Sequence, residues 1–186
     1  MPDIKEPADW PKDLEFGEMG EIFVSFALGW SRSAKKIREY DLITQIGETV
    51  ELKTDRYKYT PNPTDHRTES KNMFMEEISN KELNTLGGPR RAVRDEVAIF
   101  GYLFWPNKKL FLFKSRELLS AVDFAINGLS PKIRENKTYT TEGYAIPVSE
   151  LEGAAYKTFD FPDEMVEHFY SLKDMEPKRW KGYFRK

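Results

Sequence analysis

Residues 36–54 read KIREYDLITQIGETVELKT and predict two strands joined by a tight turn. The first strand is expected over residues 36–44 and the second over residues 49–54. The second strand, TVELKT, alternates apolar with charged residues, which is the period of two of a strand with one apolar and one polar face. We therefore expect a β-hairpin whose second strand presents its charged side chains on a single face.

The segments around this hairpin predict an α/β protein with a mixed central sheet flanked by helices. A helix capped by Asp9 or Asp13 precedes the hairpin and runs to about Gly29, and Gly20 on its apolar stripe predicts a close approach to a sheet. Residues 56–70 form a long loop, and a short connection holds the sequence GGPRR. The further elements expected are strands over 72–79, 97–105, 110–113 and 144–148, a helix capped by Ser115 and ending at Asn127, and a helix over 164–172.

Composition limits the kinds of site that the chain can build. The 186 residues fit one domain, with a core over about 14–127 and a C-terminal extension over about 128–186 that ends in a basic aromatic tail. The sequence has no cysteine and only two histidines, so thiolate sites and multi-histidine sites are excluded. Any metal must be held mainly by carboxylates, which favours Mg²⁺ or Mn²⁺.

Charge and hydropathy place the protein among soluble proteins. No signal peptide is visible, and the longest apolar runs are far shorter than a membrane span. We expect an intracellular, cytoplasmic protein with no membrane partner, and a phage origin is compatible with the sequence. The formal net charge of −2 excludes a uniformly basic coat but leaves room for a local basic surface.

The hairpin carries the candidate catalytic residues. Asp41 lies on the first strand and Glu51 on the second, so the turn between them lets the two carboxylates converge. Lys53 follows Glu51 by two positions and projects from the same strand face. Two carboxylates can hold a divalent cation, and a lysine beside them can stabilise negative charge or orient a water. The plainer alternative is a cross-strand charge pair on a solvated sheet face.

These residues resemble the motifs of the PD-(D/E)xK nuclease superfamily, which includes Holliday-junction resolvases, restriction enzymes and small phage nucleases. The resemblance rests on Gly17-x-x-x-Glu21, Asp41 and Glu51-Leu52-Lys53, with a further echo in Asn72-Met73-Phe74-Met75-Glu76 as a third core strand. It implies a restriction-endonuclease-like core and divalent-metal-dependent hydrolysis of DNA phosphodiester bonds. The sequence departs from the common pattern of the superfamily at three places. Tyr40 precedes the aspartate, Ile22 follows the helix glutamate, and a short connection stands where the fold has a crossover helix.

The resemblance also implies a role for each site residue. Asp41 and Glu51 would bind Mg²⁺ or Mn²⁺ with help from the backbone carbonyl of Leu52, Lys53 would position the attacking water, and Glu21 would be a further acidic ligand through water. Glu18 competes with Glu21 for the helix position. Glu76 and His66 are weaker candidates. Alternatively, Glu76 is an ordinary acidic residue on a half-exposed strand, and His66 is a solvated histidine in a loop.

Basic residues near the hairpin are candidates for binding DNA. Cations alternate with aromatic rings just after the second strand, and a cluster of arginines follows the GG pair, which suits phosphates and unstacked bases. The residues proposed for contact are Lys35, Lys36, Arg56, Lys58, Arg90 and Arg91. The leading prediction is a DNA nuclease, with a homodimer left open. The alternative is a non-catalytic nucleic-acid-binding or assembly module with a nuclease-like fold.

Overall fold

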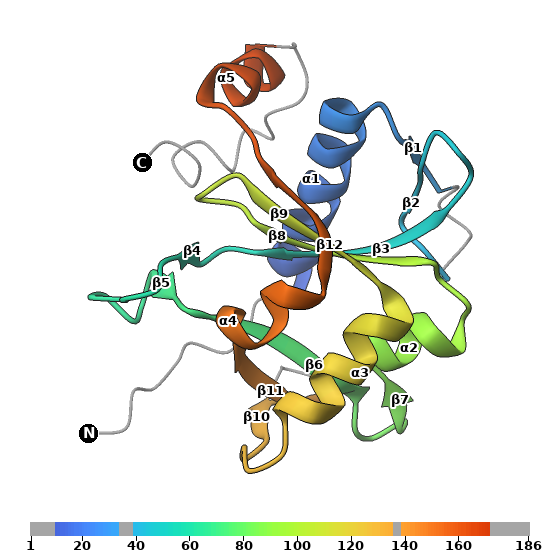
Figure 1. The fold of residues 1–186 in the computed structure, drawn as a ribbon, viewed down its shortest axis with the longest axis vertical. Coiled ribbons are helices and arrows are strands. Elements are labelled where there is room, and N and C mark those ends of the chain that lie inside the picture. The colour runs from blue at the N-terminus through green and yellow to red at the C-terminus, as the bar shows by residue number, and fades with distance from the viewer. Residues whose placement is uncertain (1–9, 34–38, 136–138, 172–186) are drawn as a thin grey trace.

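The structure, a computed structural model, describes residues 10–33, 39–135 and 139–171. It is an α/β protein in which a mixed central sheet is covered on both faces (Figure 1). Within the described residues the central sheet has six strands. In order across the sheet they are β1 (Ser31–Arg32), β2 (Leu42–Ile43), β3 (Thr49–Asp55), β8 (Ile99–Phe104), β9 (Lys109–Lys114) and β12 (Ala155–Asp160).

The hairpin of β2 and β3 forms as its sequence predicts, but with a much shorter first strand. The turn contains Gly47, whose positive φ of 85° suits glycine, and Leu42 pairs with Val50 in the antiparallel ladder. The first strand was expected over 36–44, whereas β2 covers only two residues, and residues 34–38 lie outside the described part of the chain. β1, which lies between the helix and the hairpin, pairs with β2. The expected helix to about Gly29 is α1 (Trp10–Leu28), with Asp13 inside it and Asp9 outside the described residues.

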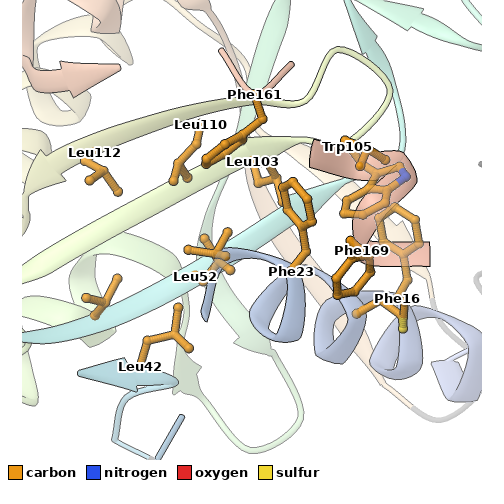
Figure 2. Close-up of a cluster of buried hydrophobic side chains, with 14 of the residues drawn as sticks. Phe16, Phe23, Leu42, Leu52, Leu103, Trp105, Leu110, Leu112, Phe161 and Phe169 are labelled. Atoms are coloured by element: carbon orange, nitrogen blue, oxygen red, sulfur yellow. The ribbon is translucent and has the colours of Figure 1, made fainter. Parts of the chain in front are cut away.

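One face of the central sheet is covered by α1. Val50 and Leu52 of β3 belong to the buried apolar cluster on this face, in which Leu52 lies near Phe23 of α1 (Figure 2). Phe23 is fully buried there and meets Trp105, Phe161 and Phe169 edge to face, with centroids 5.0–5.4 Å apart. The predicted close approach at Gly20 is confirmed, because a Cβ at that position would lie 1.9 Å from the Oγ1 of Thr54.

The opposite face of the central sheet is covered by a second sheet and two helices. In order, the second sheet contains β10 (Lys132–Glu135), β11 (Thr140–Pro147), β6 (Asn72–Asn80) and β7 (Thr85–Leu86). β6, predicted as the third core strand, is therefore not in the central sheet: the position beside β3 is taken by β8, which runs parallel to it. Met73 and Met75 of β6 instead bury themselves in the cluster that contains Tyr102 of β8.

The remaining elements complete the two layers. β4 (Lys58–Tyr59) and β5 (Glu69–Ser70) pair in parallel within the expected loop. The chain from β10 onward, expected as an extension, contributes β10 and β11 to the second sheet, β12 to the central sheet and the helix that packs on α1. The helices not yet placed are α2 (Gly88–Arg94), α3 (Ser115–Ala125), α4 (Val148–Leu151), a 3-10 turn (Glu152–Ala154) and α5 (Asp163–Ser171).

Two local predictions are wrong. The short connection after β6 contains a real helix, α2, which carries Pro89 in its first turn, where proline is well tolerated. Ser115 does not cap the next helix: Lys114 occupies the N-cap position of α3, and no side chain caps that end. No helix in the described ranges combines the length and the apolarity needed to cross a membrane.

Candidate functional site

Asp41 immediately precedes β2 and is fixed to the edge of β3. Its backbone N–H donates to the carbonyl of Val50 at 2.8 Å, and its Oδ2 accepts from the N–H of Leu52 at 2.7 Å. The carboxylate therefore takes the place that a longer β2 would fill with a backbone carbonyl. Burial raises the pKa of Asp41, against the opposing effects of the Leu52 hydrogen bond and of the Arg91 and Arg32 charges.

The carbonyl of Leu52 lies on the same edge of β3. In a strand, the N–H and C=O of one residue point to the same side, and the N–H of Leu52 points to Asp41. Beyond Leu42, no β2 residue pairs with this part of β3. The Leu52 carbonyl and the Asp41 carboxylate thus offer oxygen atoms on the same edge of β3, and among the described residues no further strand pairing covers this part of the edge.

Glu51 projects from β3 onto the face that carries the second sheet and α2. Its Oε1 accepts a hydrogen bond from the guanidinium of Arg91, whereas its Oε2 is buried and finds no hydrogen-bond partner among the described residues. Burial, followed by the charge of Asp41, raises the pKa of Glu51 to about 8, although Arg91 opposes this shift. Asp41 and Glu51 are thus close enough to influence each other's ionisation, as two carboxylates sharing one site do.

Glu21 of α1 approaches the same pair from the other face of the sheet. Burial and the charge of Asp41 raise the pKa of Glu21 to about 7, and Arg32 opposes them. Arg32 bridges Glu18 at 3.0 Å and Glu21 at 3.4 Å. The side chain of Glu18 is 46% exposed and that of Glu21 only 24%, so Glu21 is the helix acid that adds negative charge to the buried site.

Lys53 is paired with Glu76 of β6 rather than with Glu51. Its Nζ lies 2.7 Å from Oε1 of Glu76 and 5.6 Å from the centroid of the Phe74 ring. Burial alone would raise the pKa of Glu76, but the charge and hydrogen bond of Lys53 outweigh it and hold that pKa below its ordinary value. Gly87 and Gly88 allow α2 to pack against Glu76, because a Cβ on either glycine would lie within 2.8 Å of a Glu76 atom.

Arg91 is the residue of the site whose role sequence reasoning missed. It was expected to contact DNA, yet in the structure its guanidinium is hydrogen-bonded to Glu51, and its charge lowers the pKa of Asp41, Glu51 and Glu76, each against the effect of burial. Its partner Glu51 is distant in sequence, so alternation along a strand could not reveal the contact. The proline after the GG pair was the available signal that a helix starts here.

The donor atoms at this place fit a hard divalent cation through oxygen. They are the Asp41 carboxylate, the Leu52 carbonyl and the unpartnered Oε2 of Glu51, and oxygen donors are what Mg²⁺ and Mn²⁺ prefer. Within the described ranges, no three acidic or histidine side chains gather closely enough to form a metal-binding group by themselves. The site therefore offers two carboxylates and a backbone oxygen, with Glu21 within electrostatic range.

The other predicted DNA-contacting residues are scattered. Lys35 and Lys36 lie outside the described residues. Arg56 stacks over the Phe16 ring at 5.6 Å, and Lys58 pairs with Glu69 at 3.8 Å. The last of them is Arg90, which forms ion pairs with Glu77 of β6 and Asp123 of α3.

His66 lies apart from the carboxylates. It is exposed in the loop between β4 and β5, which follows the C-terminal end of β3, whereas Asp41 sits near the N-terminal end of that strand (Figure 1). Another buried acid was not anticipated: Asp55, two residues beyond Lys53, accepts a hydrogen bond from the hydroxyl of Tyr102 at 2.6 Å. That hydroxyl also accepts from the N–H of Phe74 at 3.0 Å and so ties β6 to the central sheet.

Comparison with known proteins adds no relative. A scan of the sequence against protein-family models finds no match, and a search of the curated proteins finds none either.

Proposed function

We propose that the protein is a divalent-metal-dependent nuclease that hydrolyses DNA phosphodiester bonds. The observation that carries this proposal is the proximity of three oxygen donors on the β2–β3 hairpin: the Asp41 carboxylate, the Leu52 carbonyl and the buried Oε2 of Glu51, which has no hydrogen-bond partner among the described residues. A buried carboxylate oxygen without a partner is unusual in a folded protein, and a cation ligand is one explanation for it.

The residues around this point have the chemistry that phosphodiester hydrolysis needs. When bound, a divalent cation would supply Lewis acidity, making a water more acidic and neutralising charge on a phosphate oxygen. Asp41 and Glu51 would hold it, and Glu21 would add negative charge from α1. Lys53, two residues from Glu51, would orient the attacking water or stabilise the negative charge that develops on the phosphate.

The fold supports the proposed restriction-endonuclease-like core. The hairpin with the acidic motif is followed by a helix, α2, and then by β8, which pairs in parallel with β3. A short helix between these two strands agrees with the crossover helix of that core. The long excursion through β4–β7 lies between the two core strands and supplies β6 and β7 to the second sheet.

A second candidate is a non-catalytic nucleic-acid-binding or assembly module. One observation favours it: both motif residues of β3 are already neutralised by ion pairs, Glu51 with Arg91 and Lys53 with Glu76. In such a module these pairs would be permanent parts of the core, and the protein would need no metal.

The test is cleavage of plasmid, single-stranded and branched DNA in Mg²⁺ or Mn²⁺. Asp41→Asn and Lys53→Met should each lower the cleavage rate by at least about a hundredfold, the usual scale for a positioned catalytic group. Lys81→Met is the matched control, because Lys81 forms an ion pair with Glu142 at 2.7 Å, the same length as that of Lys53, but on the surface. Equal activity in Lys53→Met and Lys81→Met would contradict the catalytic role of Lys53, and metal-independent DNA binding without cleavage would favour the second candidate.

A further inference from the structure

We propose that Arg91 is an internal counter-cation that holds the place of the divalent metal, and that metal binding must displace its guanidinium from Glu51. This inference rests on the proposed function, since it concerns how the same site is filled. It assigns to Arg91 a regulatory role, which is to set the metal concentration at which the site becomes active.

Arg91 contacts one acid of the site and acts electrostatically on two others. Its guanidinium hydrogen-bonds to Oε1 of Glu51, and its charge also acts on Asp41 and Glu76. A divalent ion held by Asp41 and Glu51 would put two further positive charges beside this guanidinium. Like charges repel strongly where water is excluded, so the ion and the guanidinium compete for the same carboxylates.

The fit of Arg91 to its place is incomplete, as expected of a group that can leave. Its Nε is buried without a hydrogen-bond partner in the described part of the chain, and so is Oε2 of Glu51. A guanidinium and a carboxylate that form a permanent pair usually make two parallel hydrogen bonds, whereas here one donor and one acceptor are left unused. The Arg91–Glu51 pair therefore lacks the stabilisation that a second hydrogen bond would give, which makes it easier for a metal ion to displace Arg91.

Arg91 also has a route out of the site. Its side chain is 30% exposed, against 14% for Glu51, so the Arg91 side chain reaches solvent to a greater extent than its partner does. The helix itself is held independently, by the two glycines against Glu76 and by Pro89 and Ala92 in the core. The guanidinium can therefore swing outward without moving α2.

Calorimetric titration with MnCl₂ tests the inference without any use of catalytic activity. Arg91→Met should bind Mn²⁺ with a Kd at least about tenfold lower than the wild type, the scale of one charge-assisted hydrogen bond that no longer competes. Arg94→Met is the matched control, because Arg94 lies on the same helix but pairs at the surface with Asp95, and its Kd should equal that of the wild type. Arg91→Lys, which keeps the charge, should fall between Arg91→Met and the wild type.

Thermal unfolding gives a second measurement and guards against a folding defect. Without metal, Arg91→Met removes the hydrogen-bond partner of the buried Oε1 of Glu51, so the Tm of the variant should fall, and Mn²⁺ should raise that Tm by more than it raises the Tm of the wild type. Adding Asp41→Asn to Arg91→Met should abolish the rise in Tm that Mn²⁺ causes, which would place the ion at Asp41 and Glu51.

The outcomes separate this inference from the proposed function. Equal or weaker Mn²⁺ binding by Arg91→Met, with binding by the wild type intact, would overturn the displacement of Arg91 and leave the metal site standing. Saturable binding by neither the wild type nor Arg91→Met would overturn both. Binding by Arg91→Met alone would support the inference in its strongest form.

Discussion

The close approach of α1 to β3 predicts that replacing glycine with alanine has different effects on stability at two positions of this helix, Gly17 and Gly20. At Gly20, a Cβ would lie 1.9 Å from Oγ1, 2.9 Å from Cβ and 3.0 Å from Cγ2 of Thr54. At Gly17, one turn earlier, a Cβ would meet nothing within 4 Å. Replacing each glycine in turn with alanine therefore separates the effect of the helix from the effect of the contact.

The expected magnitudes follow from two terms. Alanine in place of glycine stabilises a helix by about 1 kcal/mol in both variants. Only Gly20→Ala also forces an atom into occupied space, and overpacking of this kind costs about 1–3 kcal/mol. The helix term cancels in the comparison, so Gly20→Ala should be less stable than Gly17→Ala by about 1–3 kcal/mol. For a chain of this length, that difference corresponds to roughly 2–12 °C in Tm.

Urea unfolding followed by circular dichroism measures both variants on the same scale. Adding Thr54→Ala to Gly20→Ala removes the two atoms Oγ1 and Cγ2 and should recover part of the loss, and the buried Oγ1 has no hydrogen-bond partner among the described residues to lose. Equal stabilities of Gly17→Ala and Gly20→Ala would refute the contact between α1 and β3 as described.

Three further predictions concern the site and its supports. Burial raises the pKa of Glu51 from 4.5 to about 8, so between these pH values the metal-free folded state binds more protons than the unfolded state, and the free energy of unfolding should fall as pH rises from about 5 to 8. Glu51→Gln should flatten this dependence of the unfolding free energy on pH, measured by urea titration at several pH values. An unchanged slope in Glu51→Gln would contradict the assignment of the raised pKa to Glu51. Tyr102→Phe removes a donor from the buried carboxylate of Asp55 and should destabilise the protein by about 1–3 kcal/mol, whereas a change below about 0.5 kcal/mol in chemical unfolding would show that the link is dispensable. Gly88→Ala should cost about 1–3 kcal/mol, since φ is +40° there and a Cβ would lie 2.8 Å from the Glu76 carbonyl oxygen; thermal unfolding at wild-type Tm would count against this packing.

The hairpin that carries the motif could be predicted because its signals are local. Alternation in β3 and the glycine of the turn are both read within a few residues, and the stripe on α1 with Gly20 in it is equally local. The length of β2 could not be predicted in this way. Asp41 follows the strand pattern, yet its side chain replaces a ladder bond, and no periodicity distinguishes these two cases.

The contact partners of β6 and Arg91 could not be predicted from the sequence for a different reason. β6 alternates as a strand should, but its pairing with β11, in which Met73 faces Ile146, joins segments far apart in the chain. The arginines of α2 look alike in sequence, and only the packing of the helix sends Arg91 inward to Glu51 and leaves Arg94 at the surface with Asp95. Strand pattern and charge clusters identify candidates, whereas tertiary packing selects among them.

The pairing of β6 with β11 also has a consequence for the order of folding. Until residues 140–147 have been synthesised, Met73 and Met75 of β6 have no strand on the β11 side to complete their sheet. The parallel pairing of β3 with β8 likewise waits for the whole excursion between them. Such long-range contacts slow folding and prolong the exposure of apolar strand edges. We therefore expect the nascent chain to fold late, with the hairpin and α1 formed first and the second sheet closing only when most of the protein has left the ribosome.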